Sequence, residues 1–166
     1  MLFRSIFGSE YLNIGSGIQP FNAWLLIRGL RTLPARLDRI SNTTNKVLQF
    51  LKQQPKIEKV IFPFDESFPQ YQLAKQQMTG ACGLMTMVMK TQQRDEIVKF
   101  CESLQHIMMA VSWGGHESLV IPKCSGIPIA NFDPSNLEHR YVRLYVGLEE
   151  ADYLIKDLER ALQKLY

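Results

Sequence analysis

The stretch YVRLYVGLEE (Tyr141–Glu150) is typical of a β-strand that runs into a helix. Alternate side chains point to opposite faces of a strand, which separates two sets: Val142, Leu144 and Val146 on one face, and Tyr141, Arg143 and Tyr145 on the other. A buried guanidinium costs several kcal/mol unless it meets an anion or water. Arg143 therefore pairs with an acidic neighbour, reaches solvent past the tyrosines, or holds a ligand carboxylate through two parallel hydrogen bonds.

Helical and strand patterns alternate outward from this stretch. Strands are expected over residues 56–63, 82–90, 106–112 and 141–146, with a possible short one over 117–122. Helices are expected over 20–33, 34–53, 71–78, 94–104 and 149–166. Two helical faces are clear: Leu37, Ile40, Thr44, Val47 and Leu51 in the long helix, and Leu154, Leu158, Ala161 and Leu165 in the last. About four strands with interspersed helices predict an α/β or α+β fold in which helices cover the sheet.

The composition is that of one globular domain. The chain has 166 residues, of which 46% are hydrophobic and 21% charged, and this balance argues against disorder. The net charge of +3 is too small to indicate a nucleic-acid-binding surface. No apolar run is long enough to cross a membrane. Three widely spaced cysteines, Cys82, Cys101 and Cys124, predict reduced thiols in the cytoplasm.

The segment AVSWGGHESL (residues 110–119) places two adjacent glycines after a strand, which lets a ligand or another chain approach the backbone closely. No nucleophile elbow surrounds Ser112 or Ser118. His116 lies beside Glu117, but the other histidines have no ligand spacing relative to it, so no metal site is expected. By itself the segment predicts a tight turn with polar residues.

Four motifs occur in order along the chain: PFNAWLLIRGLRTLPARLDR (20–39), QYQLAKQQMTG (70–80), AVSWGGHESL (110–119) and YVRLYVGLEEADYLIKDLERAL (141–162). Together they resemble the C-terminal part of the Cys/Met-metabolism (trans-sulfuration) family of pyridoxal-phosphate enzymes. That family includes cystathionine β- and γ-lyases, cystathionine γ-synthase and methionine γ-lyase. The resemblance extends from about Ser9 to Leu165.

The resemblance implies the aspartate-aminotransferase-like fold of type I. Residues 1–33 would form the end of the large cofactor-binding domain, most of which would be missing. Residues 34–166 would form the C-terminal small domain, including the long interdomain helix. Its sheet would be mostly antiparallel and covered by helices.

The resemblance also implies the roles of individual residues. Arg143 would bind the α-carboxylate of the substrate, with Ser112 close to the same group and Val111 and Trp113 beside it. The lysine that holds pyridoxal 5'-phosphate in the family lies upstream of everything present here, in a Ser/Thr-rich context that neither Lys90 nor Lys123 matches. This chain would therefore contain no catalytic, cofactor-binding or metal-binding residue. It would be inactive without an N-terminal pyridoxal-phosphate domain.

The substrate would be a sulfur amino acid, cystathionine or methionine. Ser112-Trp113 resembles cystathionine β-lyases, whereas Val111 is nearer to methionine γ-lyases and IPKCSGI (121–127) departs from the γ branch. The family implies a homo-oligomer, a tetramer. Two other functions are open: a non-catalytic binding or assembly module that uses an exposed helix at 18–33, and a domain that senses carboxylates through Arg143 alone.

Overall fold

The computed structural model describes residues 17–165, which fall into two compact units, Met1–Ala35 and Arg36–Tyr166. The described part of the first unit holds helix α3 (Pro20–Arg31) and the first residues of α4 (Leu33–Lys52). Pro20 occupies the first turn of α3, as predicted, because its missing N–H needs no partner there. No residue of α3 is buried. Residues 1–16 of the predicted large-domain end lie outside the described part.

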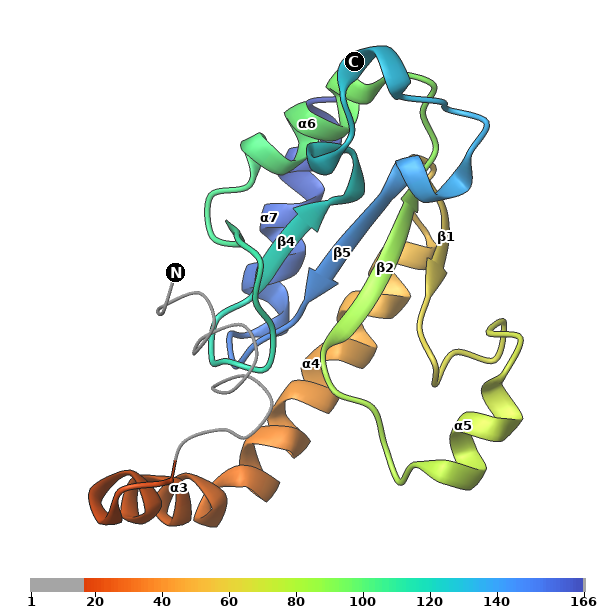
Figure 1. Ribbon diagram of the computed structural model, residues 1–166. Coiled ribbons are helices and arrows are strands. Elements are labelled where there is room, and N and C mark those ends of the chain that lie inside the picture. Colours follow the sequence, from red (N-terminus) through yellow and green to blue (C-terminus); the bar gives the residue numbers. More distant parts are fainter. Residues whose placement is uncertain (1–16, 166) are drawn as a thin grey trace, which may run out of the picture. The chain divides into compact units, whose positions relative to one another are not determined.

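The second unit is built on a five-stranded sheet in the order β1-β2-β5-β4-β3 (Figure 1). The strands are β1 (Ile57–Ile61), β2 (Leu84–Met89), β3 (Met108–Met109), β4 (Leu119–Pro122) and β5 (Tyr141–Tyr145). The pairs β1·β2, β2·β5 and β4·β5 are antiparallel, and β3·β4 is parallel. This confirms the predicted α/β class and the mostly antiparallel sheet. The expected number of about four strands was too low, because the short strand β4 pairs fully with β5.

The helices of this unit pack mainly on one face of the sheet, where Figure 1 shows α4, α6 and α7. After α4 come α5 (Tyr71–Gln77), α6 (Arg94–Ser103) and α7 (Ala151–Gln163), with short 3-10 turns η2 (Lys123–Gly126), η3 (Ile129–Asn131) and η4 (Leu137–Arg140). The sequence patterns predicted the ends of each α-helix to within two residues, except the end of α7, which lies three residues before the predicted one. The 3-10 turns were not expected.

The core lies between this helical layer and the sheet. The apolar set that alternation separated, Val142 and Leu144 on β5 and Val146 just after it, is fully buried. Of the four residues predicted for the last helical face, Leu154, Leu158 and Ala161 are buried on α7, and Leu165 is buried just beyond its end. Four of the five residues predicted on α4 are buried; Leu37 is exposed because it precedes the part of α4 that packs on the core. The periods of 2 and 3.6 therefore identified the inner faces correctly.

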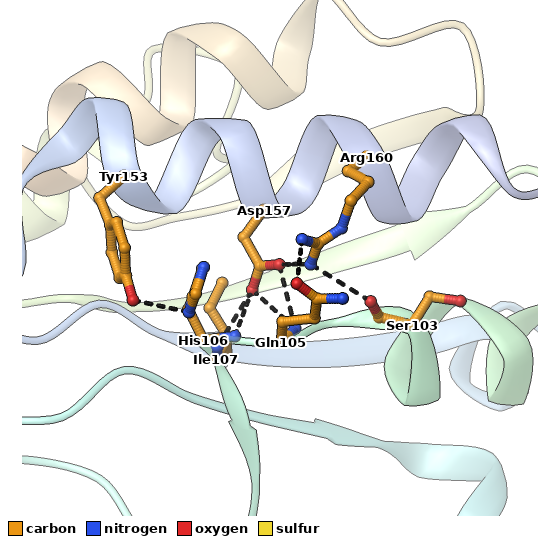
Figure 2. A network of polar contacts seen from close by, with 7 residues as sticks. All are labelled: Ser103, Gln105, His106, Ile107, Tyr153, Asp157 and Arg160. Carbon is orange, nitrogen blue, oxygen red and sulfur yellow. Dashed lines mark hydrogen bonds and ion pairs between the residues drawn. The ribbon is translucent and has the colours of Figure 1, made fainter.

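A buried carboxylate on α7 organises the entry to β3 (Figure 2). Asp157 is 1% exposed and accepts hydrogen bonds from the backbone N–H groups of Gln105 (3.0 Å), His106 (2.8 Å) and Ile107 (3.1 Å), as well as from Arg160. These N–H groups point at the carboxylate instead of at a neighbouring strand. For this reason the strand predicted over 106–112 begins only at Met108; it ends at Met109, three residues earlier than predicted.

We expect Asp157→Ala to lower the free energy of unfolding by about 3 kcal/mol, because three backbone donors and the Arg160 guanidinium lose their acceptor. Urea unfolding followed by circular dichroism measures this change. Asp152→Asn is the matched control, since Asp152 is exposed on the same helix. Equal stability of Asp157→Ala and the control would contradict the role given to Asp157.

Candidate functional site

Arg143 lies in the middle of the central strand, with Thr86 of β2 and Ile121 of β4 as its cross-strand neighbours. Its side chain is partly exposed on the face opposite the core. Nη2 donates a 3.3 Å hydrogen bond to the backbone carbonyl of Ser112. Within residues 17–165, Arg143 forms no ion pair with an aspartate or glutamate. The alternative in which an acidic neighbour neutralises it is therefore wrong for the described part of the chain.

A pocket of about 410 Å³ opens beside Arg143. Its lining contains two cations, Arg143 and Lys123, and three hydroxyl-bearing side chains, Thr86, Ser125 and Tyr141. The remaining lining residues are apolar or glycine, and none of the lining residues is acidic. A pocket with this charge and these donors suits an anionic group such as a carboxylate.

The segment 110–118 joins β3 to β4 and brings Ser112 to Arg143. Gly114 has φ +86°, a left-handed conformation that favours glycine and turns the chain back toward the sheet. The side chain of Ser112 is exposed, as are Val111 (76%) and Trp113 (63%) beside it. The structure thus unites Arg143 and Ser112, through the serine carbonyl, and places the other two predicted residues on the adjoining surface.

Tyr145 joins the same loop to β5, a role that the sequence analysis did not identify. Its side chain is 2% exposed, and its hydroxyl donates a 3.0 Å hydrogen bond to the carbonyl of Gly115. Burial raises the pKa of Tyr145, and the nearby Cys82, Glu117 and Glu149 add to this effect. In the sequence, the only indication of this role was that Tyr145 lies two residues after Arg143 and so on the same face of the strand.

No histidine or cysteine of the described chain lines the pocket beside Arg143. His116 Nδ1 lies 3.1 Å from Glu117 Oε2, and no group of three or more potential metal ligands occurs among the described residues. The three cysteines are free thiols; burial raises the pKa of Cys101 to about 12, with smaller contributions from Cys124 and Glu102. Over the described residues, no helix has both the length and the apolar character needed to cross a membrane.

Comparison with known proteins assigns the chain to a class. Residues 7–163 match the family described as Cys/Met metabolism PLP-dependent enzyme. The match covers most of the sequence, and the chain therefore belongs to this pyridoxal-phosphate-dependent family.

Individual relatives agree with this assignment. Cystathionine gamma-lyase of Macaca fascicularis is 38% identical over 156 residues, and L-methionine gamma-lyase of Treponema denticola is 36% identical over 156 residues. Each alignment covers 91% of this chain and 38% of the relative, so the chain spans well under half the length of the curated relatives. A crystal structure assigned as an O-acetylhomoserine (thiol)-lyase from Campylobacter jejuni aligns with a TM-score of 0.77 and 29% identity. This alignment covers 98% of this chain and 39% of the other, which contains N'-pyridoxyl-lysine-5'-monophosphate.

The described residues fit an anionic group of a substrate but do not make a complete site for pyridoxal phosphate. The pocket beside Arg143 has no carboxylate that could pair with a pyridine nitrogen, and its lysine, Lys123, is exposed to solvent. The donors present are a guanidinium, an ammonium and hydroxyls, which bind carboxylates well. These groups can bind and orient an anion.

The raised pKa of Tyr145 predicts a tyrosine that resists ionisation at alkaline pH. Because the folded-state pKa lies above the ordinary value of 10.0, the stabilisation is complete below that pH and is lost as the pH rises through the folded-state pKa. Ultraviolet difference titration of the wild type against Tyr145→Phe isolates this group. Tyr71→Phe is the control, and a Tyr145 signal with an ordinary midpoint would contradict the prediction.

Proposed function

We propose that this chain is the substrate-carboxylate-binding part of a pyridoxal-phosphate-dependent carbon–sulfur lyase that acts on cystathionine or methionine. The observation that carries the proposal is the position of Arg143. Its guanidinium has five N–H donors, makes one hydrogen bond to the described protein, and faces a pocket whose lining has no acidic residue. Such a cation can bind an anion that enters the pocket from outside the described protein.

Arg143 would hold the substrate carboxylate through two parallel hydrogen bonds, which fix orientation better than a point charge does. Ser112 would lie at the same group, and Val111 and Trp113 would line its outer side. Pyridoxal phosphate stabilises carbanions when it is bound, and the domain that holds it would be the N-terminal partner of this chain. The chain by itself would be inactive.

Residues 1–33 would belong to that larger domain and residues 34–166 to the small domain. We infer that the complete protein is a homo-oligomer in the cytoplasm, the latter from the three free thiols. Lys123 favours cystathionine over methionine, because cystathionine carries a second carboxylate that a second cation in the same pocket would attract.

A chimera tests the role of Arg143. Residues 7–163 replace the matching segment of Treponema denticola L-methionine gamma-lyase, and cleavage of methionine and of cystathionine is assayed. We expect Arg143→Met to lower kcat/KM by roughly 100-fold for both substrates, since two charge-assisted hydrogen bonds are lost. The kcat/KM of Arg143→Lys should lie between those of the wild type and Arg143→Met, because lysine keeps the positive charge but cannot form two parallel hydrogen bonds.

Three controls accompany this assay. Lys123→Met removes the other cation of the pocket and should weaken turnover of cystathionine alone. Visible absorbance of the bound cofactor shows that each chimera has assembled. The 166-residue chain alone, treated with pyridoxal phosphate and borohydride, should not label one lysine stoichiometrically. A chimera that tolerates Arg143→Met within twofold, or turnover by the chain alone, would refute the proposal.

The second candidate, an assembly module, rests on α3. Phe21 and Trp24 on one side of this helix, and Leu26 and Leu30 on the other, are each at least half exposed. A helix that exposes apolar side chains on both sides is typical of contact with another protein. In the carbon–sulfur lyase the same surface would contact the N-terminal domain.

We expect the isolated chain to self-associate through α3, because apolar side chains gain free energy on leaving water. Sedimentation velocity over a wide concentration range measures this. Leu26→Glu with Leu30→Glu should shift the chain toward monomer, whereas the exposed Tyr153→Glu on α7 should not. A wild-type chain that stays monomeric throughout would count against the apolar contact.

A further inference from the structure

Glu149 and Ser118 form a buried clamp between the two motifs that carry the candidate site. Ser118 is fully buried. Its backbone N–H donates to Glu149 Oε1 at 2.7 Å, and its hydroxyl donates to Glu149 Oε2 at 2.8 Å. The same hydroxyl accepts the N–H of Gly147 at 2.9 Å. Both carboxylate oxygens and the serine hydroxyl thus have partners.

The clamp is part of a longer seam between residues 115–118 and residues 145–149. Leu148 N–H donates to the carbonyl of His116 at 2.8 Å, and Tyr145 bonds to the Gly115 carbonyl. A Cβ at position 147 would collide with the His116 carbonyl, so Gly147 permits this close approach. In Figure 1 the segment before β4 and the connection from β5 to α7 lie at the same end of the sheet.

Helix α4 supports the clamp from behind. Thr43 Oγ1 donates to the backbone carbonyl of Glu149 at 3.4 Å, and Arg39 Nε donates to that of Leu148 at 3.2 Å. Arg39 also pairs with Glu150 at 2.7 Å. The backbone that presents Glu149 is therefore tied to a core helix as well as to β5.

We propose that Glu149, acting through Ser118, is a positioning residue of the carboxylate site. It holds the loop 112–117 against β5, so that the Ser112 carbonyl occupies one Nη2 donor of Arg143 and fixes the direction of the remaining donors. A group that is oriented before the ligand arrives loses less entropy on binding. The effect on substrate binding rests on the proposed function, whereas the ordering of the loop by Glu149 does not.

Fluorescence of Trp113 tests the ordering of the loop. The chain has two tryptophans, so Trp24→Phe leaves Trp113, within the loop, as the only reporter. We expect Ser118→Ala and the isosteric Glu149→Gln to lower the fluorescence anisotropy of Trp113, which is 63% exposed and therefore reports motion of the loop. Glu159→Gln is the matched control, because its carboxylate is exposed on α7 and makes no contact with the clamp among the described residues. Urea titrations define conditions in which every variant is folded, and unchanged anisotropy of Trp113 in both clamp variants there would overturn the proposal.

The chimera tests the consequence for substrate. Glu149→Gln should raise KM about tenfold and leave kcat within about twofold. In the Arg143→Met background it should have no further effect, because the two residues act through one interaction. Additive effects would overturn the positioning role. If Trp113 loosens as expected while Arg143→Met leaves KM unchanged, the loop clamp is supported and the carboxylate assignment fails.

Discussion

The cost of desolvating one guanidinium constrains how the sheet can be covered. Arg143 stands in the central strand, and its strand neighbours on either side, Val142 and Leu144, are fully buried under helices. A helix packed over the opposite face would bury the cation, and in the described residues no carboxylate pairs with it there. The packing of α4, α6 and α7 on the other face is consistent with this constraint. The cation remains available to an anion from outside.

The fold could be predicted where one periodic pattern runs over a whole element. The buried stripes of α4 and α7 and the alternation in β5 were visible because each repeats several times. The predicted start of the strand at His106 was wrong, since the backbone partner of residues 105–107 is Asp157, about 50 residues further along the chain. A contact with one distant carboxylate leaves no repeating pattern in the sequence, so it could not be predicted. The 3-10 turns between residues 123 and 140 were missed for a similar reason, because each spans at most four residues.

The candidate site also combines features that the sequence predicts with single contacts that it does not. Alternation alone placed Arg143 on the face away from the core, and the resemblance to the family added Ser112 as its neighbour. The contact uses the serine carbonyl, a backbone group that residue identity does not reveal. The bond between Ser118 and Glu149 joins positions 31 residues apart, and neither residue stands out within its own segment. The motifs at 110–119 and 141–162, which are separate in the sequence, therefore form one hydrogen-bonded unit in the structure.

Two carboxylates of the final strand–helix unit hold the segment that contains the site loop. Asp157 binds the N–H groups at its start, residues 105–107, and Glu149 binds Ser118 at its end. Between these points β3 contributes only two residues of strand pairing, too few to fix the loop by themselves. Because both carboxylates belong to residues 141–163, the element that presents Arg143 also determines where the loop meets it. The contact between Arg143 and the loop is therefore set largely from one continuous stretch of sequence, whereas other residues that line the pocket, such as Thr86 and Lys123, come from elsewhere in the chain.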